Sequence, residues 1–268
     1  SFSRSAHASM RDALLLTRQN ARLADTLRHE RDAVQAAMRA KNLFLAGVTH
    51  DLRQPVHAIG LHMRYLRSLE PQELGRETVH EACAGVDAAV HAMSSQLSRL
   101  IELSRLEAGE ARVVRRALPL ADILTRCVAQ FGPMAREKGL RLELRPTTAL
   151  VDSDARMLQS ILDNLVSNAV RYTDAGRVLI AARRRRQAIE LQVWDTGPGM
   201  PDELIPQIFI AYRRFDDRQS RHGEGQGLGL ALASRQAELL GHGIRVCSRV
   251  GRGSLFAVHL PRVEPAPA

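Results

Sequence analysis

One histidine in this chain stands beside an acid within a helical pattern. His50 precedes Asp51, and the surrounding apolar residues, among them Val48 and Leu52, recur mostly at three- and four-residue steps. His50 lies two residues past Val48, so it should project about 200° away from the apolar stripe, toward solvent. A neighbouring carboxylate can hold an exposed imidazole in one tautomer and leave its other nitrogen free as a nucleophile. Taken alone, a lone histidine is more simply a polar surface residue.

Two asparagines and an aspartate have the chemistry of a nucleotide site. Asn164 and Asn168 are one turn apart and share a helix face. An amide oxygen there can ligate Mg²⁺ while phosphates supply other ligands, although two asparagines can equally cap or hydrogen-bond neighbours. Asp195 directly follows a strand-like run, residues 189–194. A carboxylate at a strand end can accept a hydrogen bond from an adenine amino group.

Glycines follow that aspartate and open a later helical pattern. Gly197 and Gly199 would let the backbone approach a base closely. Residues 223–229 read GEGQGLG, and glycines that open a helix leave free N–H groups and a positive dipole end for phosphate oxygens. Residues 251–261 predict a tight turn and then an alternating strand. The glycine-rich run alone is a weak signal, and residues 251–261 alone are compatible with an ordinary β-turn.

Helical patterns must position His50. From about residue 8 to residue 48, apolar residues keep an imperfect 3.5-residue spacing, which predicts a long helix in a parallel dimeric coiled coil. Pro55 is expected to kink or loosen the helix that carries His50. A second helix should follow the turn near Pro71 and end near Gly109. Two such helices bury too little alone, so pairing of two chains into a four-helix bundle is expected.

From about residue 118 the pattern mixes helices and strands. The predicted strands are residues 140–144, 177–182, 189–194, 244–248 and 254–260. Helices beside such a sheet indicate an α+β layer sandwich, with the adenine pocket between helices and sheet.

Composition excludes several classes of protein. Cys83, Cys127 and Cys247 form no CxxC pair, which argues against a zinc site or a disulfide framework and favours a reducing cytoplasm. The sequence has no run of about 18 apolar residues and no signal-peptide pattern at its start. The net charge is +9, but the run Arg183–Arg186 reads as a solvated hairpin without aromatic interleaving. We therefore expect no nucleic-acid partner.

The order of these motifs resembles that of two-component sensor histidine kinases. Residues 50–55 read HDLRQP, close to the family's phosphoacceptor form His-Glu-Leu-Arg-Thr-Pro. The asparagine motif, the Asp-Gly-Gly motif, a Phe motif at residues 208–214, the Gly-Leu-Gly loop and the final Gly-x-Gly-Ser strand follow in the family's order. The resemblance covers about residues 40–262.

The resemblance implies an α+β fold with four segments. Residues 1–40 would be a signalling coiled-coil helix, and residues 41–112 a dimerisation and histidine-phosphotransfer hairpin that forms a four-helix bundle in the homodimer. Residues 117–262 would be an α/β-sandwich ATP-binding catalytic domain, and residues 263–268 a linker. Because the chain begins with Ser and ends in a Pro/Ala tail, we expect a cytoplasmic piece of a longer protein, and attachment of that protein to the inner membrane stays open.

The family's functional residues can be carried onto matching positions. His50 would accept the phosphoryl group, Asp51 would orient it, and Gln54 stands at the position tied to removing phosphate from the partner. The implied cofactors are ATP and Mg²⁺, with Asn168 as the metal ligand. The other implied nucleotide-site residues are Asn164, Arg171, Tyr172, Asp195, Gly197, Gly199, Arg214, Gly225, Gly227, Leu228 and Gly229.

The chain departs from the family's pattern at several positions. Gln54 replaces a common Thr or Asn, which leaves phosphatase activity open. Arg171 replaces a common Lys, so charge is kept while geometry is not. Gln226 replaces the usual Thr of the glycine loop, and Arg213 enlarges the Phe motif.

The implied reaction is phosphoryl transfer from Mg·ATP to His50 and onward to an aspartate of a response-regulator receiver domain, separate or fused. Two alternatives remain at this stage. An ATPase of the wider superfamily with gyrase and heat-shock chaperones would share the Asn and Gly motifs without needing the His50 motif. A dimeric scaffold without transfer would keep the architecture but lose catalytic groups. The signal, the receiver and the choice between transfer within or between subunits stay open.

Overall fold

The structure is a computed structural model with two compact units, residues 1–51 and residues 52–268. It describes residues 23, 25–28, 30–32, 34–35, 38, 47–49, 52–69, 75–185, 188–210 and 228–263. In the first unit, residues 25–28, 30–32, 34–35 and 47–49 are helical, as the spacing predicts. Leu23, Leu27, Val34 and Met38 are each more than half exposed. These four apolar side chains therefore have no cover among the described residues.

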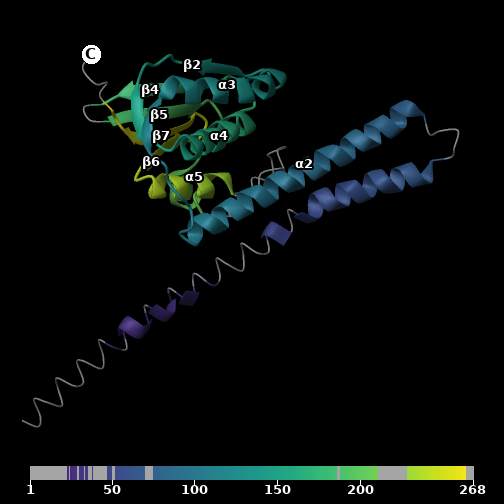
Figure 1. Ribbon diagram of the computed structural model, residues 1–268, viewed down its shortest axis with the longest axis horizontal. Coiled ribbons are helices and arrows are strands. Elements are labelled where there is room, and N and C mark those ends of the chain that lie inside the picture. Colours follow the sequence, from purple (N-terminus) through teal and green to yellow (C-terminus); the bar gives the residue numbers. More distant parts are fainter. Residues whose placement is uncertain are drawn as a thin grey trace, which may run out of the picture. The chain divides into compact units, whose positions relative to one another are not determined.

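The second unit begins with a helical hairpin (Figure 1). Residues 52–68 are helical through Pro55, and the second helix is α2, Arg76–Glu107. The two helices approach closely at Gly85, where an added Cβ would lie 2.3 Å from Nε2 of His62. α2 ends as predicted, because Gly109 adopts a left-handed φ of 70° just past it.

A five-stranded mixed sheet follows in the order β2-β4-β5-β7-β6. β2 is parallel to β4, and the other neighbouring pairs are antiparallel. The strands are β2 Arg141–Leu144, β4 Arg177–Arg184, β5 Ala188–Asp195, β6 Gly243–Arg249 and β7 Gly253–Pro261. Each predicted strand is confirmed to within two residues at either end.

Three helices cover the sheet, and Figure 1 shows α3 and α4 lying along it. They are α3 Leu120–Glu137, α4 Ala155–Tyr172 and α5 Gly229–Leu239, and a short 3₁₀ helix, η1, covers Asp202–Gln207. Alternate residues of β5, namely Ile189, Leu191 and Val193, are fully buried. The expected α+β sandwich is therefore confirmed. No helix within the described ranges is long and apolar enough to cross a membrane.

A small second sheet was not foreseen from the sequence. β1, Arg116–Pro119, pairs antiparallel with β3, Leu150–Ser153, in a separate two-stranded sheet. The arginine run is solvated as expected, because Arg183, Arg184 and Arg185 are all exposed, although Arg185 also donates to the buried carboxylate of Glu190 at 2.8 Å. β1 and β3 have only four residues each, which is too short for an alternating pattern to be detected in the sequence. Glu190, the partner of Arg185, lies on the far side of the hairpin turn.

Candidate functional site

The helix that carries both asparagines, α4, is fastened at each end. Asp154 is its N-cap, and one carboxylate oxygen accepts the backbone N–H of Arg156 at 2.9 Å. Burial disfavours the charge on Asp154, but backbone donors outweigh it and hold its pKa below the usual value. At the other end, Lys138 Nζ donates to three carbonyl oxygens, of Val170, Arg171 and Thr173, at 2.6–3.4 Å. The asparagine face of α4 is thus held in place by charged groups at both helix ends.

The two asparagines have different surroundings. Asn164 Nδ2 donates to the Ser160 carbonyl at 2.9 Å, and its Oδ1 faces the start of α5. An added Cβ at Gly229 would lie 2.7 Å from that oxygen, so only glycine lets α5 begin this close to α4. Asn168 is half-buried, and its amide has no hydrogen-bond partner among the described residues. The Asn168 oxygen is therefore available to a ligand.

Asp195 ends β5 with one carboxylate oxygen already engaged. Oδ1 accepts the backbone N–H of Gly197 at 2.9 Å and that of Ser254 at 3.2 Å. Burial raises the pKa of Asp195, and these two donors only partly oppose it. The arrangement fixes the carboxyl group and leaves its second oxygen for another donor.

Glycines allow the loops beside Asp195 to pack against each other. Gly199 has a φ of +67°, and an added Cβ would lie 2.0 Å from the carbonyl oxygen of Arg249. Gly253 has a φ of +90°, and its Cβ would lie 2.0 Å from the carbonyl oxygen of Asp195. Any side chain at either position would collide with backbone.

Two hydroxyl groups complete this site and were missed in the sequence. Ser248 Oγ accepts the backbone N–H of Met200 at 2.8 Å and lies 3.0 Å from Ser254 Oγ. Thr173 Oγ1 is buried without a hydrogen-bond partner in the described part of the chain, and an added Cβ at Gly197 would lie 3.3 Å from it. An orphaned hydroxyl beside Asp195 suits a site that holds a polar ligand. No short motif marks Ser248, whose only signal is a polar residue in a strand.

The site brings a free amide, a half-engaged carboxylate and a buried hydroxyl to the region between α4, β5 and the start of α5. Such groups suit a nucleotide base with its phosphates. Residues 153–264 match the family described as histidine kinase-, DNA gyrase B- and HSP90-like ATPases. Residues 40–109 match the His Kinase A (phospho-acceptor) domain. The chain belongs to the sensor histidine kinases.

Several sensor histidine kinases are similar to the chain along most of its length. It is 30% identical to the uncharacterized sensor-like histidine kinase R01002 of Rhizobium meliloti, over 85% of the chain and 44% of that protein. It is 34% identical to the sensor histidine kinase AruS of Pseudomonas aeruginosa, over 90% of the chain and 24% of AruS. The chain therefore spans less than half the length of these curated relatives. Among solved structures, full-length ShkA in complex with AMPPNP has a TM-score of 0.62 at 26% identity, over 85% of the chain and 47% of ShkA.

The remaining residues expected from the histidine kinase pattern differ in exposure, and some lie outside the described residues. Gln54 is exposed on the first hairpin helix, and Tyr172 is 47% exposed at the end of α4. Arg171 is half-buried, and its charge helps burial to lower the pKa of Arg99 in α2. Leu228 is buried just before α5. The predictions on His50, Asp51, Arg214, Gly225 and Gly227 lie outside the described residues.

Proposed function

We propose that the chain is the kinase core of a sensor histidine kinase that transfers the γ-phosphoryl group of ATP to His50 and then to a receiver aspartate. The observation that carries the proposal is Asp195, fixed by two backbone N–H groups beside the Thr173 hydroxyl, which has no partner among the described residues. The free oxygen of Asp195 suits the adenine amino group. The match of residues 40–109 to a phospho-acceptor domain favours this function over that of an ATPase without an acceptor.

A few side chains have distinct roles in the phosphoryl transfer. One ring nitrogen of His50 attacks the γ-phosphorus, the bond to the β–γ bridging oxygen breaks, and ADP leaves. Asp51 accepts the N–H of the other ring nitrogen and so orients the imidazole. Arg171 and Arg214 offset the charge of the phosphates, and Mg²⁺ held through the free oxygen of Asn168 would neutralise more of it. The phosphoryl group then passes to a carboxylate oxygen of the receiver, which regenerates His50.

The remaining site residues shape the nucleotide pocket. We assign Asn164 and Tyr172 to its sides. Gly225, Gly227 and Gly229 would provide backbone N–H groups for the phosphates, and Gly197 and Gly199 allow the base to approach. The buried position of Leu228 suits a role in anchoring the start of α5 rather than direct contact. Gln54 would meet the receiver, where its amide could orient a water for phosphate removal.

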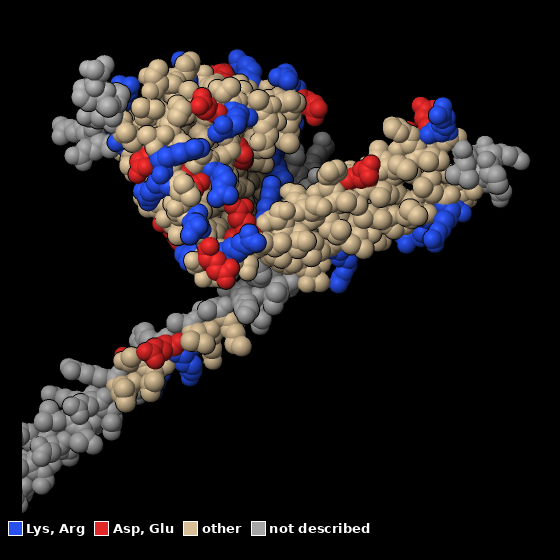
Figure 2. All heavy atoms as spheres, in the orientation of Figure 1, with Lys and Arg blue, Asp and Glu red and all other residues tan. Residues whose placement is uncertain are grey.

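The hairpin favours a homodimer. Its described helices expose large apolar side chains, and Figure 2 shows few charged side chains on the hairpin surface in view. These apolar residues are Val56, Leu61, Met63, Tyr65, Val79, Val90, Leu97 and Ile101. A second copy would cover them in a four-helix bundle, with residues 1–40 continuing as a coiled coil. Light scattering that finds a monomer at micromolar concentration would contradict this part of the proposal.

The segment boundaries follow from the same assignment. The phosphotransfer hairpin is residues 41–112, the catalytic domain is residues 117–262, and residues 263–268 form a linker. We place this fragment in the cytoplasm, where ATP is available and where Cys83, Cys127 and Cys247 can stay as the free thiols seen in the structure. The full-length protein would bring a sensor, attached to the inner membrane or soluble.

The direct test is incubation of the purified chain with γ-labelled ATP and Mg²⁺, followed by acid or alkali. Label on His50 should be lost in acid, survive alkali and be absent from His50→Gln. The matched control is His57→Gln, because His57 is an exposed histidine of the same predicted helix and should keep the label. Undiminished label in His50→Gln would refute the acceptor assignment.

A further inference from the structure

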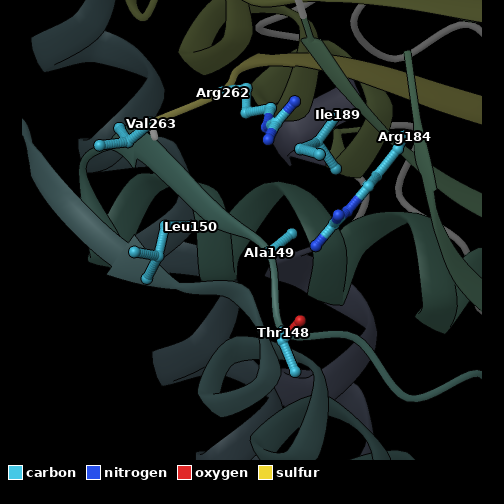
Figure 3. A pocket seen from close by; sticks show the side chains of 7 residues that line it. All are labelled: Thr148, Ala149, Leu150, Arg184, Ile189, Arg262 and Val263. Atoms are coloured by element: carbon cyan, nitrogen blue, oxygen red, sulfur yellow. The ribbon is translucent and has the colours of Figure 1, made fainter. Parts of the chain in front are cut away.

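A hollow of about 250 Å³ lies where β4 ends and β5 begins (Figure 3). It is lined by Thr148, Ala149, Leu150, Arg184, Ile189, Arg262 and Val263. Ile189 and Asp195 stand near opposite ends of β5, about 20 Å apart at the rise of an extended strand. The hollow is therefore separate from the nucleotide site.

Four of the seven lining residues form an apolar part of the wall. Ile189 is fully buried and Ala149 is 4% exposed, while Leu150 and Val263 are half-buried. The backbone of this wall is satisfied internally, because the Ala149 carbonyl accepts the N–H of Leu120 at 3.0 Å and the Leu150 carbonyl accepts that of Val263 at 3.1 Å. The wall thus offers hydrocarbon surface to the apolar part of a ligand.

Two arginines reach this hollow from different strands. Arg184 ends β4 and Arg262 follows β7, and Figure 3 shows both side chains extending beside Ile189. Neither guanidinium has an acidic or hydrogen-bond partner within the described ranges, whereas the adjacent Arg185 is paired with a buried carboxylate. The hydroxyl of Thr148 likewise has no described partner. Both arginines are exposed, and two guanidinium groups that lack a described partner at one hollow favour an anion with two charges.

We propose that this hollow binds a small organic dianion, either a phosphomonoester or a dicarboxylate. Arg184 and Arg262 would hold its charged group, and Ile189 and Ala149 would contact its apolar part. The volume lies below the roughly 300–1,000 Å³ of pockets for drug-sized ligands, so the hollow is too small for a nucleoside triphosphate. β4 and β7 flank β5, the strand that carries Asp195. The bound ligand would therefore link the end of β4 to the end of β7.

The test is calorimetric titration of the full chain with phenyl phosphate and, separately, with phthalate. AMPPNP and Mg²⁺ are present at saturation, so that the nucleotide site is filled. We expect saturable binding of at least one probe, and the tighter probe identifies the phosphomonoester or the dicarboxylate as the class. Arg184→Gln and Arg262→Gln should each weaken it about tenfold. Inorganic phosphate should bind more weakly than phenyl phosphate, because it lacks an apolar part.

Arg183→Gln is the matched control, because it removes the same charge from the next residue. Arg183 lies opposite Glu190 in the strand register, and so faces away from the hollow, whereas Arg184 lies opposite Ile189. Equal weakening by Arg183→Gln, absence of binding by both probes, or inorganic phosphate binding as tightly as phenyl phosphate would overturn the proposal. So would a roughly tenfold gain in Glu264→Gln, because the occupant would then be the chain's own carboxylate. Unchanged melting temperatures would show that each variant folds.

Discussion

The ammonium group of Lys138 lies 2.6 Å from the carbonyl oxygen of Arg171, across the boundary between α3 and α4. Lys138 follows α3 in the chain, whereas Arg171 lies in the last turn of α4, three residues after Asn168. The contact ties the asparagine motif to an element that carries no motif of its own. Lys138, which belongs to no nucleotide-site motif, therefore positions Arg171, which belongs to the asparagine motif.

Lys138→Met should lower the free energy of unfolding by about 1–2 kcal/mol, because a partly buried charged donor to the helix end is lost. Chemical denaturation of the purified chain measures this loss. Lys138→Arg is the matched control, since it keeps the charge and donors, and it should recover part of the stability. Equal stability of the Met variant and the native chain would mean that solvent satisfies these carbonyls.

Ser248 should affect nucleotide binding without contacting the nucleotide. Ser248→Ala removes the acceptor of the Met200 N–H and frees the loop after Gly199. We expect the Kd for ATP to rise about two- to tenfold, the effect of one neutral hydrogen bond. Fluorescence titration with a labelled ATP analogue measures this change. Ser98→Ala, which removes a hydroxyl bonded within α2, should leave the Kd unchanged, and an equal effect in both variants would exclude a local role for Ser248.

Substitutions at Gly199 and Gly251 distinguish the cost of left-handed backbone from the cost of a Cβ that collides with neighbouring backbone. Both have positive φ, 67° and 75°, but only at Gly199 would a Cβ meet backbone, whereas at Gly251 nothing lies within 4 Å. Gly251→Ala should cost about 1–2 kcal/mol of stability, the price of left-handed backbone alone. Gly199→Ala should cost more and also abolish ATP binding, because the loop must move from Arg249. Thermal melting and ATP titration of both variants measure the contrast, and equal losses would contradict it.

The fold was largely predictable because its elements have strong periodicity. β5 and β7 are long and lie inside the sheet, where nearly every residue is buried, so each gives a recognisable strand-length segment in the sequence. β1 and β3 have four residues each, too few for alternation to be distinguished from a loop. Sequence alone therefore located the main sheet and missed the small one.

The site was predictable only where its residues lie in motifs. Asp195, Gly197 and the asparagines are close in sequence to other site residues, and their chemistry is recognisable. Ser248 and Lys138 act through contacts between positions 48 and 33 residues apart in the sequence, which no local pattern encodes. Asn164 illustrates the limit within a motif, because its oxygen faces the backbone of Gly229 and its amide nitrogen is already engaged by Ser160.

His242 should make the stability of the catalytic domain depend on pH. Its side chain is buried, 3% exposed, with Nε2 2.9 Å from Ser153 Oγ. Burial, aided by the charge of Arg115, lowers its pKa to about 4, against 6.5 for an ordinary histidine. The unfolded chain therefore binds a proton more readily than the folded one between these two values. Stability from this group is fully present above about pH 6.5 and is lost as the pH falls through about 4, by roughly 2–3 kcal/mol.

Urea denaturation at a series of pH values from 4 to 7 measures this loss. His242→Gln has no titrating group here, so its free energy of unfolding should fall less steeply with acid than that of the native chain. His242→Gln should also be less stable at pH 7, because the contact with Ser153 is lost. That loss does not change how steeply the free energy of unfolding falls with pH. His80→Gln, at an exposed position of α2, is the matched control and should keep the native slope. Parallel curves for His242→Gln and the native chain would show that other groups account for the acid sensitivity, and that the buried imidazole is not the group that takes up the proton on unfolding.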